Sequence, residues 1–200
     1  MAEKNENPGR PEGEIGIKML NRMNKSHAPL REWGFKYLNL TDSMHILDVG
    51  CGGGATISDL LELAENSYVE GLDYAQESVD LSRKYNSKFI DTRCRIHLGN
   101  VQDLQFDENT FDLITAVETV YFWPDIKTAL SQVFRVTKKS GVFFILCEMG
   151  NPSQYSQSDF DFYINLYEPD ELRKLCIETG FADVKIKRGP NNYYCIICRK

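Results

Sequence analysis

The sequence predicts an α/β fold, in which a seven-stranded, mostly parallel sheet carries helices on both faces and ends in an antiparallel hairpin. Three observations support this prediction. A short apolar run at 45–49 is followed by four glycines and then by apolar residues at helical spacing. Apolar strand-like runs then alternate with amphipathic helical segments along the chain. Two further strand-like runs, 182–188 and 193–198, are joined by a Gly-Pro-Asn-Asn turn.

The composition limits the kinds of partner. The 200 residues suit one domain, and their net charge of −6 with no extended basic face argues against nucleic acid. No apolar run approaches the ~20 residues of a membrane helix, and no signal peptide is recognisable, so no membrane partner is expected. The six cysteines are scattered, and a cytoplasmic protein with reduced, buried thiols is predicted. Cys195 and Cys198 have CxxC spacing but lie in an apolar strand, which favours packing over metal binding.

The residues before the glycine turn divide into two parts. Residues 1–13 are polar and interrupted by proline and glycine, which predicts a mobile tail. Within 14–44, apolar residues at helical spacing predict two short amphipathic helices that meet near His27. His27 is either a general base at the mouth of a pocket or a local capping or packing residue.

The stretch 45–57 organises the rest of the chain. A strand, a glycine turn and a helix in this order direct free N–H groups and the positive end of a helix dipole into a crevice. A dinucleotide fingerprint would have the spacing Gly-x-Gly-x-x-Gly. Here Asp48 is followed by Gly50, Gly52 and Gly54 at alternate positions. A carboxylate at this point repels a pyrophosphate and suits a ligand that carries an ammonium or sulfonium charge.

This motif resembles the first motif of the class I S-adenosylmethionine-dependent methyltransferases, which has the form Asp/Glu-x-Gly-x-Gly-x-Gly. The resemblance covers about residues 45–200 and implies a Rossmann-like sheet with S-adenosylmethionine as the cofactor. The turn residues expected at the cofactor are Gly50, Cys51 and Gly52, together with Asp48. The chemistry needs no metal, and no metal-ligand cluster is visible in the sequence.

A second acid follows about 20 residues after the turn. A helix at 55–66 leads to a strand at 68–73 that ends in Asp73. The resemblance implies that Asp73 accepts the ribose hydroxyls and that Tyr74 flanks the adenine. Asp73 could instead cap the helix predicted at 75–87, and NAD-binding folds use the same acid.

The third and fourth strands contribute the next predicted contacts. After a strand at 93–98, the resemblance implies that Asn100 meets the adenine amine and that the N–H of Val101 meets a ring nitrogen. Asn100 replaces the aspartate that is usual in the family. The strand at 111–117 ends in Val117, which would border the methionine part of the cofactor.

Glu118 follows directly and could face the ammonium group, face the substrate or act as a proton acceptor; it could also only hydrogen-bond the lid. The aromatic residues 121–123 could form a wall for the sulfonium or pack in the core.

The remaining elements complete the sheet. A helix beginning at Ile126 is expected to end near the basic and glycine residues of 138–141, ahead of a fifth strand at 142–147. Residues 148–167 match no family motif and are predicted to be a substrate-lid insert, because polar and aromatic loops at the carboxyl edge of a sheet often bind substrates. A helix from Pro169 to Gly180 precedes the hairpin.

The sequence thus predicts a tail at 1–13, a helical lid at 14–44 and a cofactor-binding domain at 45–200. The segments look most like the group that includes ubiquinone- and menaquinone-biosynthesis methyltransferases, and the expected function is methyl transfer to a small-molecule acceptor. Two alternatives remain open: an NAD-linked oxidoreductase, and a catalytically silent cofactor-binding partner subunit. The sequence does not give the acceptor or the oligomeric state.

Overall fold

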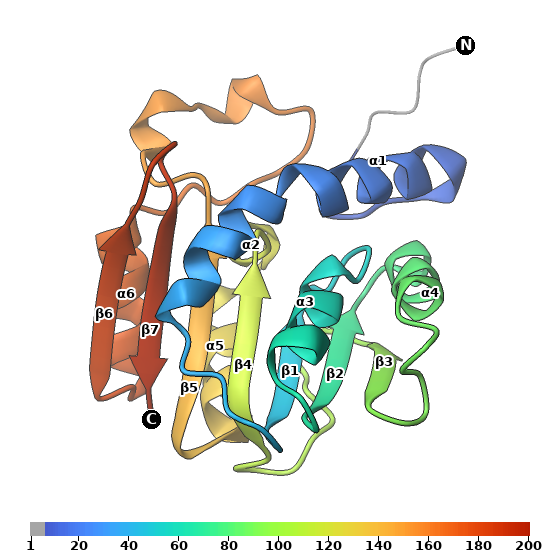
Figure 1. Ribbon diagram of the computed structural model, residues 1–200. Coiled ribbons are helices and arrows are strands. Elements are labelled where there is room, and N and C mark those ends of the chain that lie inside the picture. The colour runs from blue at the N-terminus through green and yellow to red at the C-terminus, as the bar shows by residue number, and fades with distance from the viewer. Residues whose placement is uncertain (1–6) are drawn as a thin grey trace.

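The protein is described by a computed structural model over residues 7–200. Its centre is a seven-stranded sheet with the order β3-β2-β1-β4-β5-β7-β6 (Figure 1). From β3 to β5 the neighbours pair in parallel, and β7 pairs antiparallel with both β5 and β6. The predicted sheet and its closing hairpin are therefore confirmed. The strands are β1 (His45–Val49), β2 (Tyr68–Asp73), β3 (Cys94–Leu98), β4 (Phe111–Val117), β5 (Thr137–Cys147), β6 (Asp183–Arg188) and β7 (Tyr194–Arg199).

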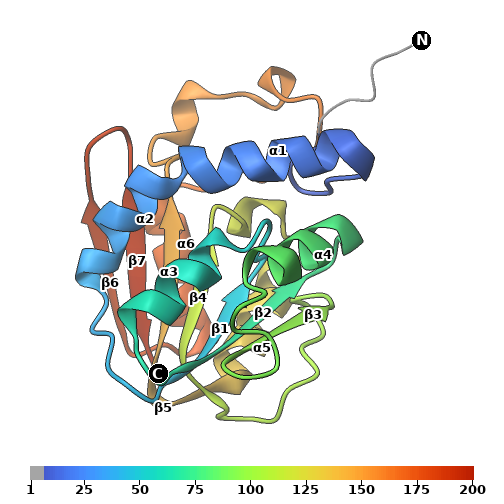
Figure 2. The same ribbon diagram turned by 45° about the vertical axis from the view of Figure 1, so that its right-hand side comes forward.

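Helices cover both faces of this sheet, as the two views show (Figures 1 and 2). One core cluster joins the sheet to α2 (Ala28–Gly34), α3 (Ala55–Leu63) and α4 (Gln76–Tyr85). A second cluster, on the other face, joins it to α5 (Ile126–Val136) and α6 (Pro169–Thr179). Alternate strand residues enter opposite clusters because side chains of a strand point to opposite faces in turn.

The cysteines follow this two-sided packing. All six are buried and unpaired. Cys195 lies in the cluster with α2 and α3, whereas Cys198 lies in the cluster with α5 and α6. The CxxC spacing therefore places the two thiols on opposite faces of β7, where they cannot bind one ion together.

The amino-terminal segment lies over the sheet. Helix α1 (Gly13–Ser26) runs across the carboxyl ends of the parallel strands, and α2 continues from it after a break at His27, where the sequence predicted a hinge (Figure 2). A short 3-10 turn, η1 (Phe35–Tyr37), follows. Of the predicted tail, residues 1–6 lie outside the described part of the chain. Residues 7–12 pack against the molecule, and Pro11 among them is buried.

The boundary between α5 and β5 differs from the prediction. We expected the helix to end near 138–141, but α5 ends at Val136 and β5 begins at Thr137. Lys138 does not stay at the helix end: its Nζ lies 2.8 Å from Asp112 on β4. A register shift between β4 and β5 accommodates the extra residues. The helix carbonyls are instead bound by Lys200, whose Nζ lies 2.7 Å from the oxygen of Phe134.

The insert at 148–167 contains only short 3-10 turns, η3 (Pro152–Gln154) and η4 (Gln157–Asp159). It braces the turn η2 (Val120–Phe122), because Asn165 donates from its backbone to the oxygen of Tyr121 and from its side chain to that of Trp123. Phe162 packs on Phe122 with 5.9 Å between ring centroids. Within residues 7–200, no helix combines the length and apolar character that crossing a membrane would require.

Candidate active site

A cavity of about 230 Å³ lies at the carboxyl ends of the parallel strands, beneath α1. Its floor comes from the turn after β1 and the ends of β2, β3 and β4, and its roof comes from α1 and residues 8–11. The position is the point where β1 lies between β2 and β4 and the strand order reverses, which is where open α/β sheets bind ligands. All predicted site residues except Asp48 line this cavity: His27, Gly50, Cys51, Gly52, Asp73, Tyr74, Asn100, Val101, Val117 and Glu118.

The glycine turn is shaped by two residues with positive φ. Gly50 has φ +72°, and a Cβ there would lie 2.1 Å from Oγ1 of Thr119, so only glycine fits. Gly52 has φ +50° and faces open space, with the Leu20 side chain 3.7 Å from the position of a Cβ. Its backbone N–H donates to Oδ2 of Asp73 at 2.9 Å. The turn and the second acid therefore lie side by side, as the sequence predicted.

Asp73 links the turn to the start of α4. Its Oδ1 accepts from the N–H of Ala75 at 3.0 Å. Ala75 is the N-cap residue of α4, so Asp73 does not occupy the capping position that we considered as an alternative. Burial raises the pKa of Asp73, and the N–H groups of Ala75 and Gly52 oppose that rise. The carboxylate is thus held in one orientation at the cavity wall.

Asp48 lies behind the turn rather than on the cavity surface. It is 1% exposed, and its Oδ1 accepts from the hydroxyl of Thr115 at 2.6 Å. Its Oδ2 is buried without a hydrogen-bond partner among the described residues. Burial raises the pKa of this carboxyl to about 7. A positive charge in the neighbouring cavity would favour its ionised form.

Tyr74 and Asn100 stand at the end of the cavity near Asp73. The hydroxyl of Tyr74 donates to the carbonyl oxygen of Gly9, so it holds residues 8–11, which we call the strap, over the cavity mouth. The amide oxygen of Asn100 accepts from the N–H of Gln102 at 2.9 Å. Its other lone pair and its NH₂ group remain available to a ligand.

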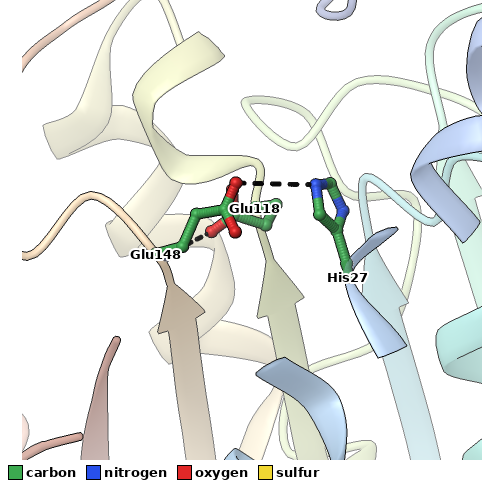
Figure 3. A group of neighbouring side chains, drawn as sticks. All are labelled: His27, Glu118 and Glu148. Carbon is green, nitrogen blue, oxygen red and sulfur yellow. Dashed lines mark hydrogen bonds and ion pairs between the residues drawn. The ribbon is translucent and has the colours of Figure 1, made fainter. Parts of the chain in front are cut away.

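Three ionisable groups meet at the opposite end of the cavity (Figure 3). His27 comes from the junction of α1 and α2, Glu118 follows β4, and Glu148 follows β5. One ligand atom from each lies within 4.8 Å of the others, a spacing that a metal ion could bridge. Phe122 and Trp123 also line the cavity, whereas Tyr121 is buried and donates from its hydroxyl to Oε2 of Glu118 at 2.8 Å.

Burial changes the charge of these groups. It raises the pKa of Glu118 to about 8, and the neighbouring Glu148 adds to this rise. The pKa of His27 is lowered to about 4 by burial and by the nearby charge of Arg31. At neutral pH this part of the cavity therefore contains a neutral imidazole, and Glu118 is largely protonated. Such an arrangement can accept and donate hydrogen bonds, and it holds little positive charge.

Several residues that line the cavity or adjoin it were not found from the sequence. Glu148 was included in the insert without a role, although it directly follows a buried strand, which was the available signal. Arg31 was not singled out; its Nε donates to Oδ2 of Asp59 at 2.6 Å. The strap was assigned to the mobile tail, because proline and glycine at the start of a chain usually indicate disorder.

The chain is similar in sequence to known methyltransferases. Residues 47–145 match the protein family described as "Methyltransferase domain". The demethylmenaquinone methyltransferase of Lactiplantibacillus plantarum is 31% identical over 131 residues, which are 64% of this chain and 55% of the relative. The chain spans about half the length of the relatives that it matches.

Solved structures share the fold over nearly all of the chain. A SAM-dependent methyltransferase from Aquifex aeolicus is 18% identical with a TM-score of 0.75, over 92% of this chain and 97% of that one. A putative methyltransferase solved in complex with the Trm112 activator of Haloferax volcanii is 16% identical with a TM-score of 0.80, over 91% and 93%. At identities of 16% and 18%, the similarity to these structures shows a shared fold only.

Proposed function

We infer that this chain belongs to the class I S-adenosylmethionine-dependent methyltransferases, and we propose that it transfers a methyl group from S-adenosylmethionine to a small-molecule acceptor. The observation that carries the proposal is the contact between the Gly52 N–H and the Asp73 carboxylate, which joins the two cofactor motifs in one cavity wall. A small-molecule acceptor is supported by relatives whose names refer to a hydroquinone and to demethylmenaquinone.

The residues of the cavity fit this cofactor in two respects. Gly52 leaves open space where a Cβ would stand, so a ligand can approach the backbone of the turn. Oδ2 of Asp48, buried and unpartnered among the described residues, would be compensated by the positive charge that the ligand carries. We assign the ribose hydroxyls to Asp73 and the adenine to Tyr74, Asn100 and the N–H of Val101. The methionine part is assigned to the turn residues Gly50, Cys51 and Gly52, with Asp48 behind them, and to Val117.

Methyl transfer from this cofactor requires few catalytic groups from the protein. When bound, S-adenosylmethionine supplies a methyl group that its sulfonium charge already activates. The chain must hold the acceptor in line, exclude water and take up a proton where the acceptor loses one. Both His27 and Glu118 line the cavity and are the proposed proton acceptors. His27 is neutral and can accept a proton directly, whereas Glu118, whose pKa is raised to about 8, can do so only in its ionised form. We propose that residues 14–44 form a lid over the cavity. Residues 148–167 would form a supporting part of the substrate site.

The proposal extends to location and partners. Six buried, unpaired cysteines support a reducing compartment and hence the cytoplasm. The net charge of −6 supports a partner other than nucleic acid, and the cavity supports a small molecule rather than a membrane surface.

Calorimetric titration with S-adenosylhomocysteine and with NADH tests the cofactor. We expect saturable binding of the first and none of the second; the reverse result would indicate an oxidoreductase and contradict the proposal. A labelled-methyl transfer screen against quinols, phenols, amines and thiols then tests the activity. Tight cofactor binding without transfer to any of these classes, together with recovery of an obligate partner on pull-down, would favour a silent partner subunit.

A further inference from the structure

The part of the cavity around His27 contains an unused pair of polar groups. Nε2 of His27 lies 3.9 Å from Oε1 of Glu148, which is too long for a hydrogen bond. Neither the imidazole nor the Glu148 carboxylate makes a side-chain hydrogen bond within residues 7–200. The two groups point toward each other across a gap (Figure 3). An atom that carries two hydrogens could donate to both.

Glu118 is different, because both of its oxygens are already engaged. Oε1 accepts from the backbone N–H of Glu148 at 2.6 Å, and Oε2 interacts with the Tyr121 hydroxyl at 2.8 Å. Glu118 therefore fixes the backbone of Glu148 and closes the cavity from behind. His27 and Glu148, which make no side-chain hydrogen bond among the described residues, therefore have the most unused capacity to bind an incoming ligand.

The local charge excludes one class of ligand. The nearby cation, Arg31, is bound to Asp59 and to the carbonyl oxygen of Asn24. No other lysine or arginine is among the cavity-lining residues that the structure describes. The Glu148 carboxylate thus stands here without a cationic partner, beside the largely protonated Glu118. A carboxylate, phosphate or phenolate would be repelled, whereas a cation would be attracted.

The neighbouring aromatic side chains favour the same kind of ligand. Phe122 and Trp123 line the same cavity and follow Glu118 closely in the chain. The faces of aromatic rings attract cations, most strongly where water is excluded. Carboxylates and aromatic rings together are the usual means by which proteins bind an ammonium group.

We propose that the methyl acceptor is a small primary or secondary amine, whose nitrogen lies beside this pair, within hydrogen-bond distance of both Nε2 of His27 and the carboxylate of Glu148. This inference rests on the proposed function and names the substrate class of the same site. Glu148 pairs with the ammonium form, and neutral His27 accepts a hydrogen bond from a second N–H.

The transfer step is then balanced as follows. The bound ammonium gives one proton to the Glu148 carboxylate, whose side chain is 42% exposed and can pass the proton to water. The freed lone pair on nitrogen forms the new N–C bond while the C–S bond of the sulfonium breaks and its electrons remain on sulfur. The products are the methylated ammonium, the thioether and one released proton.

A divalent metal ion at the same three residues is the competing explanation. It is less well supported because each Glu118 oxygen already accepts a hydrogen bond, which leaves two free ligands instead of three. The amine, in contrast, needs only His27 and Glu148. The two explanations differ in their response to a chelator.

The experiment uses four probes of one shape: 2-phenylethylamine, 2-phenylethanol, 2-phenylethanethiol and 3-phenylpropanoate. Calorimetry measures the binding of each to the complex with S-adenosylhomocysteine, and labelled-methyl transfer is measured in parallel. We expect binding and transfer for the amine, with at least tenfold weaker binding for the other three.

Glu148→Gln should weaken amine binding about tenfold or more, because a charge-assisted hydrogen bond is lost. Asp161→Asn, which removes one exposed acid from the same insert, should leave it unchanged.

The outcomes separate the two proposals. Failure of the wild type to bind S-adenosylhomocysteine would overturn the proposed function. Normal binding of that compound with no preference for the amine, or with unchanged amine affinity in Glu148→Gln, would overturn the amine acceptor alone. Loss of transfer in EDTA with recovery in Mg²⁺ would replace it with the metal site. Preference for the amine that persists in EDTA would support it.

Discussion

Asp73 is the residue through which the two sides of the cavity are joined. Its two oxygens accept from the backbone of the glycine turn and from the start of α4, and the residue is buried. A carboxylate fixed in this way needs little reorganisation when a ligand presents hydroxyl groups to it. Its loss should therefore affect binding through the contacts themselves and through the turn that it orients.

Asp73→Ala is expected to weaken the binding of S-adenosylhomocysteine by about 2 kcal/mol or more, which is roughly 30-fold in Kd, because hydrogen bonds to a charged acceptor are lost. Isothermal titration measures the change. Asp80→Asn removes an exposed acid of α4 with the same change in charge and serves as the control. Equal affinities for the wild type and Asp73→Ala would contradict the ribose assignment.

Glu118 should make stability depend on pH. Its pKa is raised from an ordinary value of 4.5 to about 8, chiefly by burial. Its contribution is therefore fully present below pH 4.5 and is lost as the pH rises to about 8, since the unfolded chain ionises first. Each unit by which the pKa is raised corresponds to about 1.4 kcal/mol in the free energy of unfolding.

Glu118→Gln keeps the shape and removes the titration. Urea unfolding at pH 5 and at pH 8 should show that the variant gains stability relative to the wild type by at least about 1 kcal/mol between the two values. Asp48 titrates in the same direction in both proteins, so the comparison cancels its contribution. A constant difference across this range would indicate that Glu118 ionises at an ordinary pH in the folded protein.

At the scale of elements, the strap and α1 determine access to the cavity. Residues 8–11 cross its mouth and are held by the hydroxyl of Tyr74 on Gly9 and by the packing of Gly9 against the ring of Phe122. Gly13, the first residue of α1, is tied to α4 because its N–H donates to Glu77 at 2.9 Å. A bound ligand can leave only if these contacts open or the ligand passes beside them.

Tyr74→Phe removes the hydroxyl and keeps the ring. A hydrogen bond of this kind contributes about 0.5–1.5 kcal/mol, so S-adenosylhomocysteine should dissociate roughly 2- to 13-fold faster. Stopped-flow displacement gives the rate, and Tyr85→Phe, at the other end of α4, is the matched control. An unchanged dissociation rate would mean that the strap does not retain the ligand.

For the whole molecule, the cavity is shared between the amino-terminal helices and the sheet, so a ligand there should stabilise the complete fold. At a concentration 100 times its Kd, S-adenosylhomocysteine should add about 2.7 kcal/mol to the free energy of unfolding. For a chain of this size that corresponds to a rise in Tm of roughly 5–10 °C. Differential scanning fluorimetry measures it, with NADH as the control that should leave Tm unchanged.

The sequence predicted most of the sheet because its signals are local. Buried strands such as β1 and β4 are continuous apolar runs, and the turn before β7 contains Gly-Pro-Asn-Asn, whose two asparagines adopt positive φ. The end of α5 was misplaced because the basic residues after it had two possible partners. Asp112 lies in the neighbouring strand, and a lysine more than 60 residues away binds the helix carbonyls. Neither contact leaves a local signal.

The candidate site also contains one part that was predictable from the sequence and one part that was not. The glycine turn and Asp73 are linked by one crossover of known length, so their proximity was predictable. His27 and Glu148 are 121 residues apart and come from elements whose relative placement depends on the whole packing of α1 and β5 over the sheet. Glu148 also sits at the start of an insert without a recognisable motif. Its pairing with His27 could be found only in three dimensions.

The burial of all six native thiols makes the protein convenient for site-specific labelling. Arg10 lies in the strap and is exposed, so Arg10→Cys would offer an accessible thiol beside the entrance of the cavity. An environment-sensitive fluorophore coupled there would report directly on opening and closing of this entrance. Reporter intensity followed during mixing with ligand would then distinguish an entrance that opens before binding from one that moves afterwards.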